Sequence, residues 1–154
     1  MSQTSVSQYG AAGFAGLLAD NGTFNTMSYS AEGAIGFGVP VVLGTNKERQ
    51  VVAIGTGVGQ AALAVGIAVS GIVEQTSAGV AAYADKDTVG VIKEGRIWVN
   101  TDDAVTAGAV ANLKLSNGKF TDEAVASGIE AFTQFSARFI TGTTGAGLAI
   151  VEIK

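Results

Sequence analysis

Three glycines follow a short β-branched run at a spacing that could hold a dinucleotide. The run, residues 51–54, leads into the glycines, and reading from Gly57 gives the pattern G-x-G-x-x-A, which ends at Ala62. Glu74 follows at about the separation expected of an acid that binds a ribose hydroxyl. In such a site the pyrophosphate rests on backbone N–H groups at the start of a helix.

The elements that this chemistry needs are poorly indicated. Residues 60–69 have no polar face and contain an internal glycine, so they make a poor helix. The fold would also need parallel strands with crossover helices, whereas the rest of the chain predicts strands and turns. We therefore expect no cofactor, and interpret residues 50–66 as two buried strands joined by a glycine-rich connection. A small nucleotide-binding protein or enzyme that uses residues 55–62 is the lesser alternative.

Carboxylates occur in three close pairs, which raises the question of acid–base or calcium chemistry. The pairs are Asp85 with Asp87, Asp102 with Asp103, and Asp122 with Glu123. The first lacks the rest of a calcium loop, and few aromatic residues are present to line a sugar cleft. Solvated turns account for all three pairs. The sequence contains no histidine and no cysteine, which removes the commonest general base and the usual transition-metal ligands. We predict no catalytic residue, no metal site and a protein that is not an enzyme.

Composition narrows the possible partners. The net charge is −4 and no basic cluster exists, so direct nucleic-acid binding is not expected. Residues 51–69 carry no charge, but their glycines and β-branched residues favour buried strands over a membrane span. Only 14% of the residues are charged while 47% are hydrophobic. Such a chain is expected to have much of its surface covered in an assembly.

The elements predicted from residue 38 onward are short strands and turns. Residues 89–93 and 96–100 alternate in polarity on either side of Glu94 and Gly95, which predicts a tight hairpin. Residues 121–128 are the best candidate for one short helical turn. Strands spaced by about 8–12 residues are typical of a sandwich or barrel. The expected fold is all-β, a compact β-barrel or jelly-roll-like sandwich with at most one short helix.

The first 37 residues differ from the rest, because glycine, serine, asparagine and aromatics occur there without a sustained period. We expect an extended N-terminal arm over 1–37 and a β domain over 38–154. A partly disordered tail is the alternative, against which stand the many apolar anchors of the segment. Seven residues are the candidates for contact with a partner or a second copy: Phe14, Leu17, Leu18, Phe24, Tyr29, Phe37 and Trp98.

Several segments, in this order along the chain, resemble the structural cement (decoration) proteins of tailed-bacteriophage capsids. GFAGLLAD (13–20) is a glycine-aromatic segment, and SYSAEGAIGFGVPVVLGTNKERQV (28–51) has a glutamate and a Phe-Gly pair before the first core strand. AVGIAVS (64–70) corresponds to a Gly-Val/Ile-Ala strand. The stretches VGVIKEGRIWVN and AVTAGAVANLKLSNGKF and the closing strand pair SARFITGTTGAGLAIVEI complete the series.

The resemblance implies a structural virion protein. It would bind the outer surface of a phage capsid, in particles assembled in the host cytoplasm, and clamp neighbouring subunits of the major capsid protein. Its own copies would form homodimers or homotrimers on the shell. The alternative is another β-barrel virion component, such as a tail-tube or head–tail joining protein.

Overall fold

The computed structural model describes residues 13–19, 22–71 and 82–154. Strands dominate, and one helical turn, α1, is present among the described residues. The strands are β1 (Asn25–Ala31), β2 (Ile35–Gly36), β3 (Pro40–Leu43), β4 (Gln50–Ala53), β5 (Ala64–Ala68), β6 (Ala82–Tyr83), β7 (Thr88–Thr101), β8 (Asn112–Lys114), β9 (Lys119–Thr121), β10 (Ile129–Glu130), β11 (Ala137–Phe139) and β12 (Gly147–Ile153); α1 is Gln60–Leu63. The expected all-β barrel with at most one short helix is confirmed.

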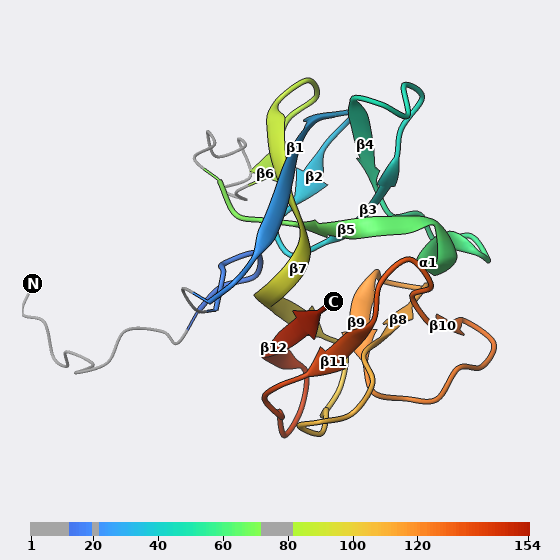
Figure 1. Cartoon of the computed structure of the whole chain (residues 1–154). Helices are drawn as coiled ribbons and strands as arrows, with labels where there is room; N and C mark the ends of the chain where they lie inside the picture. Colours follow the sequence, from blue (N-terminus) through green and yellow to red (C-terminus); the bar gives the residue numbers. More distant parts are fainter. Residues whose placement is uncertain (1–12, 20–21, 72–81) are drawn as a thin grey trace, which may run out of the picture.

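The first half of β7 closes a five-stranded barrel, the upper part of Figure 1. The strands follow the order β1, β4, β3, β5 and β7, and β7 pairs back with β1. Within this barrel the pair of β1 and β4 is parallel, and the other neighbouring strands are antiparallel. Alternating apolar residues fill this barrel, because successive strand side chains point to opposite faces. Its core contains Tyr29, Ala31, Ile35, Val41, Val51, Ala68, Tyr83, Val89 and Val91.

The second half of β7 belongs to another closed circuit, the lower part of Figure 1. Strand β12 pairs with β7 on one side and with β11 on the other. Strand β11 bonds to residues 109–111, which lead into β8, and β9 joins β8 back to β7. The second core includes Ile97, Val99, Phe120, Phe139, Val151 and Ile153, each at most 1% exposed. The molecule is therefore two small barrels that share one long strand.

The hairpin expected at Glu94 and Gly95 is wrong, because β7 continues through both residues as one strand of 14 residues. Gly95 has a φ of 129° and lies where the strand changes partner. Before it β7 pairs with β1, and from it onward β7 pairs with β12. The glycine lets the strand bend from one barrel into the next instead of reversing.

The helical turn expected over residues 121–128 is also misplaced. That segment links β9 to β10 by turns, with Thr121 Oγ1 accepting from the Glu123 amide at 3.2 Å and Ala126 pairing with Ile129. The helical turn instead occupies Gln60–Leu63, directly before β5.

The predicted arm needs a new boundary. Strands β1 and β2 lie within 1–37, and both are paired with strands of the body. Ala31 and Ile35 have no exposed surface. Residues from Asn25 onward therefore belong to the first barrel, and an N-terminal arm, which stays a prediction, is confined to the residues before it. In the described part of the chain no helix is long and apolar enough to cross a membrane.

Candidate functional site

Residues 13–19 lie along the second half of β7 as an added, irregular strand. The Gly16 amide donates to the Trp98 carbonyl at 2.8 Å, and the Trp98 amide donates to the Leu17 carbonyl at 2.9 Å. A third bond joins the Ala19 amide to the Arg96 carbonyl at 2.9 Å. Strand β7 is therefore paired on both sides here, with β12 on one edge and this N-terminal segment on the other.

The N-terminal segment is held by close backbone crossings. A Cβ on Gly16 would lie 2.7 Å from the Phe37 Cβ and 2.9 Å from the Gly38 nitrogen, so the crossing of these two backbone segments leaves no room for a side chain at Gly16. Gly13 lies against the indole ring of Trp98, where a Cβ would come within 2.6 Å of ring atoms. The Ser70 amide donates to the Gly16 carbonyl at 2.7 Å. These contacts bring Leu17, Phe37 and Trp98 into one region of the molecule.

The seven predicted contact residues divide by exposure. Phe14 is 51% exposed and Phe24 is 48% exposed, so both present apolar surface to solvent. Leu17 and Trp98 are half-buried. Leu18 packs on the core of the second barrel, and Phe37 meets the Tyr83 ring edge-on at 5.3 Å. Tyr29 is 8% exposed and belongs to the core of the first barrel, so it offers little to a partner.

The sequence reasoning missed other exposed apolar residues. Met27 on β1 is 46% exposed, Leu63 on α1 is 58% exposed, and Val58 is 92% exposed. The signal for Val58 was available, because a valine between Gly57 and Gly59 suits the tip of a loop. Met27 is one of the apolar anchors of the first 37 residues, but its exposure depends on which strands flank β1 and so was not predicted.

Strand β4 precedes the glycine pattern, and residues 55–62 form a loop and the start of the helical turn, but a carboxylate of the chain itself bonds to the backbone amides there. Glu130 Oε1 accepts from the Gly59 amide at 2.5 Å, and Glu130 Oε2 accepts from the Ala61 amide at 3.0 Å. A phosphate would need these same donors and would meet the negative charge of Glu130. Glu74, the expected ribose ligand, lies outside the described residues. Glu130 thus fixes the loop that carries the exposed Val58, and the bonded amides leave no site for a dinucleotide phosphate.

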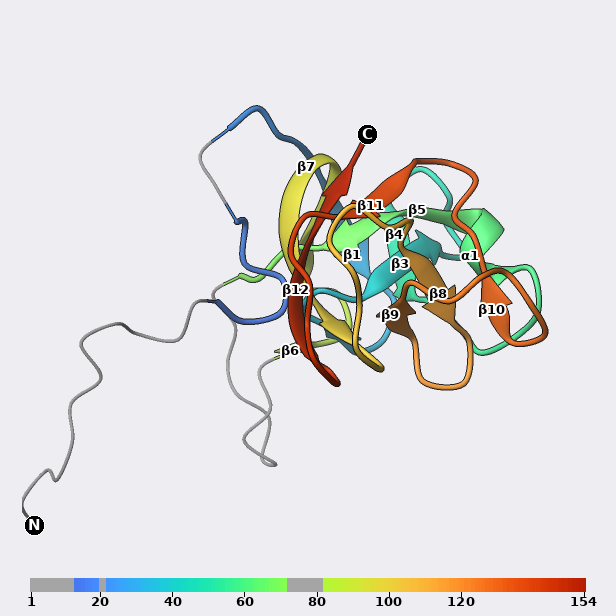
Figure 2. The same cartoon turned by 90° about the horizontal axis from the view of Figure 1, so that it is seen from below.

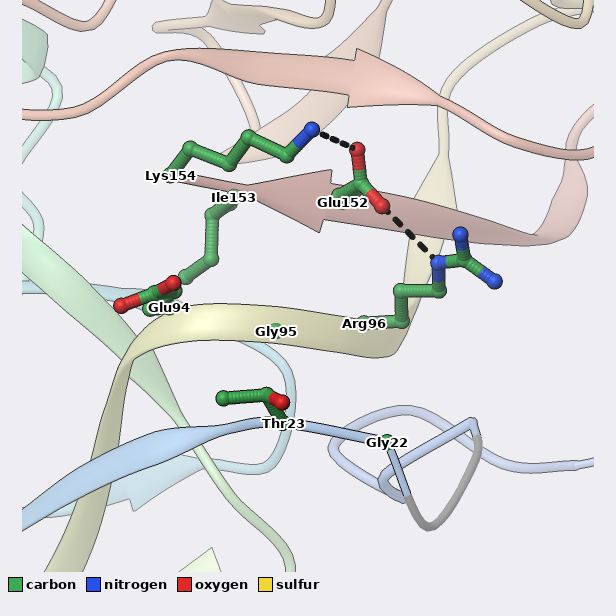
Figure 3. Close-up of a pocket in the computed structure, with 8 residues that line it drawn as sticks. All are labelled: Gly22, Thr23, Glu94, Gly95, Arg96, Glu152, Ile153 and Lys154. Carbon is green, nitrogen blue, oxygen red and sulfur yellow. Dashed lines mark hydrogen bonds and ion pairs between the residues drawn. The ribbon is translucent and has the colours of Figure 1, made fainter.

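A cavity of about 320 Å³ lies between residues 22–23, β7 and the C-terminal end of β12. Figure 3 shows Glu152 between Arg96 and Lys154, with Glu94 apart from them. The Arg96 Nε and the Lys154 Nζ each lie 2.9 Å from a Glu152 oxygen. Hydrogen bonds from Lys154 and then Arg96 hold the pKa of Glu152 below its usual range. These charges bind one another and join β12 to β7.

The predicted carboxylate pairs also have structural partners. Asp102 bonds to Lys114 Nζ and to the Asn117 amide, and these bonds lower the pKa of Asp102. Asp87 Oδ2 accepts from the Ala84 amide at 2.8 Å, and Asp122 Oδ2 accepts from the Thr106 amide at 2.8 Å. The Asp87 bond is local and fixes a turn, whereas Asp102 and Asp122 bond to residues 12 and 16 positions away along the chain. Among the described residues no group of three acids is placed to hold a metal ion.

The fold and the surface together define an interaction protein: a pair of β-barrels that displays isolated apolar side chains and an added N-terminal strand. The family model described as "Structural cement protein (E217 gp24/Pam3 gp6)" matches residues 2–154. The chain therefore belongs to the phage structural cement proteins, and its role is a structural one in stabilising a capsid.

A solved structure supports the same fold. A chain in the structure titled "The capsid of Myoviridae Phage XM1" superimposes with a TM-score of 0.72 at 18% identity, covering 97% of this chain and 95% of that chain. No curated protein matches the sequence. Because the superposition covers 97% of this chain, the likeness of fold extends over both barrels.

Proposed function

We propose that this chain binds the outer surface of a phage head and holds neighbouring major capsid protein subunits together. The match of the cement family model to residues 2–154 is the observation that carries the proposal. The capsid assembly in which the structural neighbour was solved agrees with it. In this role the protein is not an enzyme, since it acts by occupying a boundary between subunits and resisting their separation.

The apolar side chains at the N-terminal end of the molecule supply the contact. Phe14 is presented by a segment that three backbone hydrogen bonds fix to β7, so little conformational entropy is lost when it meets a partner. Phe24 follows at the start of β1 with a similar exposure. Burial of apolar area contributes about 25 cal/mol per Å², so two aromatic side chains stabilise a contact without any charged pair.

Repetition over the shell strengthens each of these contacts. A copy that touches two capsid subunits binds the second at a high effective concentration, so contacts of modest affinity add up to a stable lattice. The copies themselves associate as homo-oligomers in this proposal. A tail-tube or head–tail joining protein would instead occur as one ring or stack, and the cement family match favours the shell.

Reconstitution tests the proposal. Shells assembled from the major capsid protein alone are mixed with the purified chain, and bound copies and the temperature of shell disruption are measured. We expect saturable binding over the whole outer surface and a higher disruption temperature. Binding at a single vertex, or none, would contradict the role.

A pair of variants tests the contact itself. Phe14→Ser removes an exposed aromatic from the N-terminal segment, and Val110→Ser changes a residue of similar exposure, 52%, in the second barrel. We expect Phe14→Ser to weaken shell binding on the order of tenfold, because buried aromatics carry much of an interface's energy. Val110→Ser should bind as the parent does. Equal effects of the two variants would show that Phe14 is not a specific contact.

A further inference from the structure

Strand β1 has an open edge beside its middle residues. On one side it pairs with β7 from Asn25 to Ser30, whereas on the other side β4 reaches only Ser30 and Ala31. In Figure 1 the lower part of β1 extends past the start of β4. Within the described part of the chain, no strand pairs with this edge of β1 at the residues before Ser30.

The hydrogen-bond pattern identifies the groups at that edge. The Ala31 amide donates to the carbonyl of Asp87, the residue directly before β7, at 2.8 Å, and the Ser30 amide donates away from β7, to the Arg49 carbonyl at 2.7 Å. Backbone groups alternate in direction along a strand, so Thr26 and Ser28 point the same way as Ser30. Their N–H and C=O groups form a short row of two donors and two acceptors.

The surroundings of this row lack the usual protections of an edge strand. Residues 24–30 carry no charged side chain and no proline, the devices that commonly keep edges from pairing. Met27 lies between the two residues whose backbone groups face outward and is 46% exposed, and Phe24, directly before the strand, is 48% exposed. A register shift between Asn25 and Thr26 ends the regular edge, so the row is limited to three residues.

We propose that this edge pairs with the same edge of a second copy, antiparallel across a twofold axis. Thr26 of each copy then exchanges both backbone hydrogen bonds with Ser28 of the other, and the two Met27 residues meet on the axis. The row is self-complementary, because reversal of a strand with donors and acceptors at Thr26 and Ser28 places each donor opposite an acceptor.

Two properties of the edge favour a second copy as the occupant. An uncharged strand meets its own copy without the like-charge repulsion that charged edges impose. The exposed Met27 side chains cover each other only when both copies present the same residue at the axis. The interface is small, so the free dimer is weak, and high local concentration on a shell would strengthen it. This inference gives an interface to the proposed oligomer, and its test uses free protein without capsids.

Disulfide trapping tests the register directly, because the chain contains no cysteine. In the proposed pairing Met27 faces its own copy as a pair that is not hydrogen-bonded, with Cα atoms about 4.5 Å apart, within the range of about 4.4–6.8 Å that disulfides span. The Asn25 residues of the two copies are offset by four positions, about 14 Å along the strand. We expect oxidised Met27→Cys to form a covalent dimer, and Asn25→Cys to form on the order of tenfold less.

A backbone variant supplies the second readout. Thr26→Pro removes the outward N–H and places a ring at the edge, whereas Thr26→Val keeps the N–H and changes only the side chain. Sedimentation measurements across a concentration series should show that Thr26→Pro weakens dimerisation on the order of tenfold to a hundredfold. Thr26→Val should dimerise as the parent does. Circular dichroism verifies that both variants are folded.

The outcomes separate this interface from other occupants. Equal trapping of the Met27→Cys and Asn25→Cys variants, or dimerisation unchanged in Thr26→Pro, would overturn the proposal. A parent chain that stays monomeric and untrapped would do the same; if Thr26→Pro then lost binding to capsid shells, the edge would belong to the capsid protein. Failure of the cement role leaves the trapping result unaffected, because trapping requires only the free chain.

Discussion

Gly16 crosses Phe37 and Gly38 so closely that replacement by any other residue has two separate costs. Its φ of 86° lies in the left-handed region, and a Cβ would lie within 2.9 Å of three atoms. Gly33 provides the matched control, because its φ is 85° but no atom lies within 4 Å of the Cβ position. The pair separates the cost of backbone conformation from the cost of the close approach.

We expect Gly33→Ala to destabilise the protein by about 1 kcal/mol, the cost of a left-handed conformation for alanine. Gly16→Ala should cost at least about 3 kcal/mol, because overpacking adds to the conformational cost. Urea unfolding followed by circular dichroism measures both. Equal losses in the two variants would mean that the N-terminal segment shifts outward at little cost.

Residue types predicted part of the candidate surface, and the rest depended on neighbours that the sequence does not name. Phe14 and Phe24 are among the predicted contacts, and both are exposed. Their apolar character before the first barrel strand is visible in the local sequence alone. Tyr29 was expected beside them, but it packs in the first core because β7 and β4 flank the end of β1. Glycine spacing predicted the loop at Val58, yet Glu130, which braces that loop, lies far along the chain.

At the scale of elements, the alternating pattern over residues 89–100 identified strand positions correctly and their connection wrongly. A bend inside a strand and a turn between two strands both place a glycine after a polar residue, so local sequence does not distinguish them. The distinction comes from β1 and β12, which pair with different halves of β7. Barrel closure likewise joins strands that are distant in sequence, so the class of fold was predictable and the strand order was not.

The join between β7 and β12 makes one contribution to stability depend on pH. Hydrogen bonds from Lys154 and Arg96 lower the pKa of Glu152 in the folded protein. A lowered folded pKa means that the contribution is fully present above the ordinary pKa of glutamate. It is lost as the pH falls through that value towards the lowered pKa.

We expect Glu152→Gln to be less stable than the parent near neutral pH, and the difference to shrink as the pH falls towards about 3. Urea midpoints for both proteins across this range measure the effect. Added salt should also shrink the difference at neutral pH, because the three side chains are partly exposed and their attraction is screened. Parallel pH curves for the two proteins would show that the ion pairs do not stabilise this join.

For the whole molecule, the shared strand β7 couples the two barrels. Val91 belongs to the first core and Ile97 to the second, on one continuous strand. Neither barrel closes without its half of β7, and residues on the two sides of Gly95 are joined by a single extended backbone. Loss of either core therefore withdraws strand pairs from the other, and we expect both barrels to unfold in one transition.

Matched valine substitutions test this coupling. Val91→Ala in the first core and Val151→Ala in the second each remove two buried carbons, for a loss of about 2 kcal/mol. Val125→Ala, at a residue 61% exposed, should change stability by less than about 0.5 kcal/mol. Trp98, the only tryptophan, reports by fluorescence on the second half of β7, while circular dichroism reports on both barrels.

In thermal unfolding, both core variants should lower the midpoint seen by Trp98 fluorescence and the midpoint seen by circular dichroism together, by about 4–8 °C for a chain of this size. If Val91→Ala lowered only the circular dichroism midpoint and left the Trp98 midpoint unchanged, the first barrel would be unfolding alone. The coupled result matters for a capsid cement, because a load applied to one barrel then has to break both cores before the chain opens.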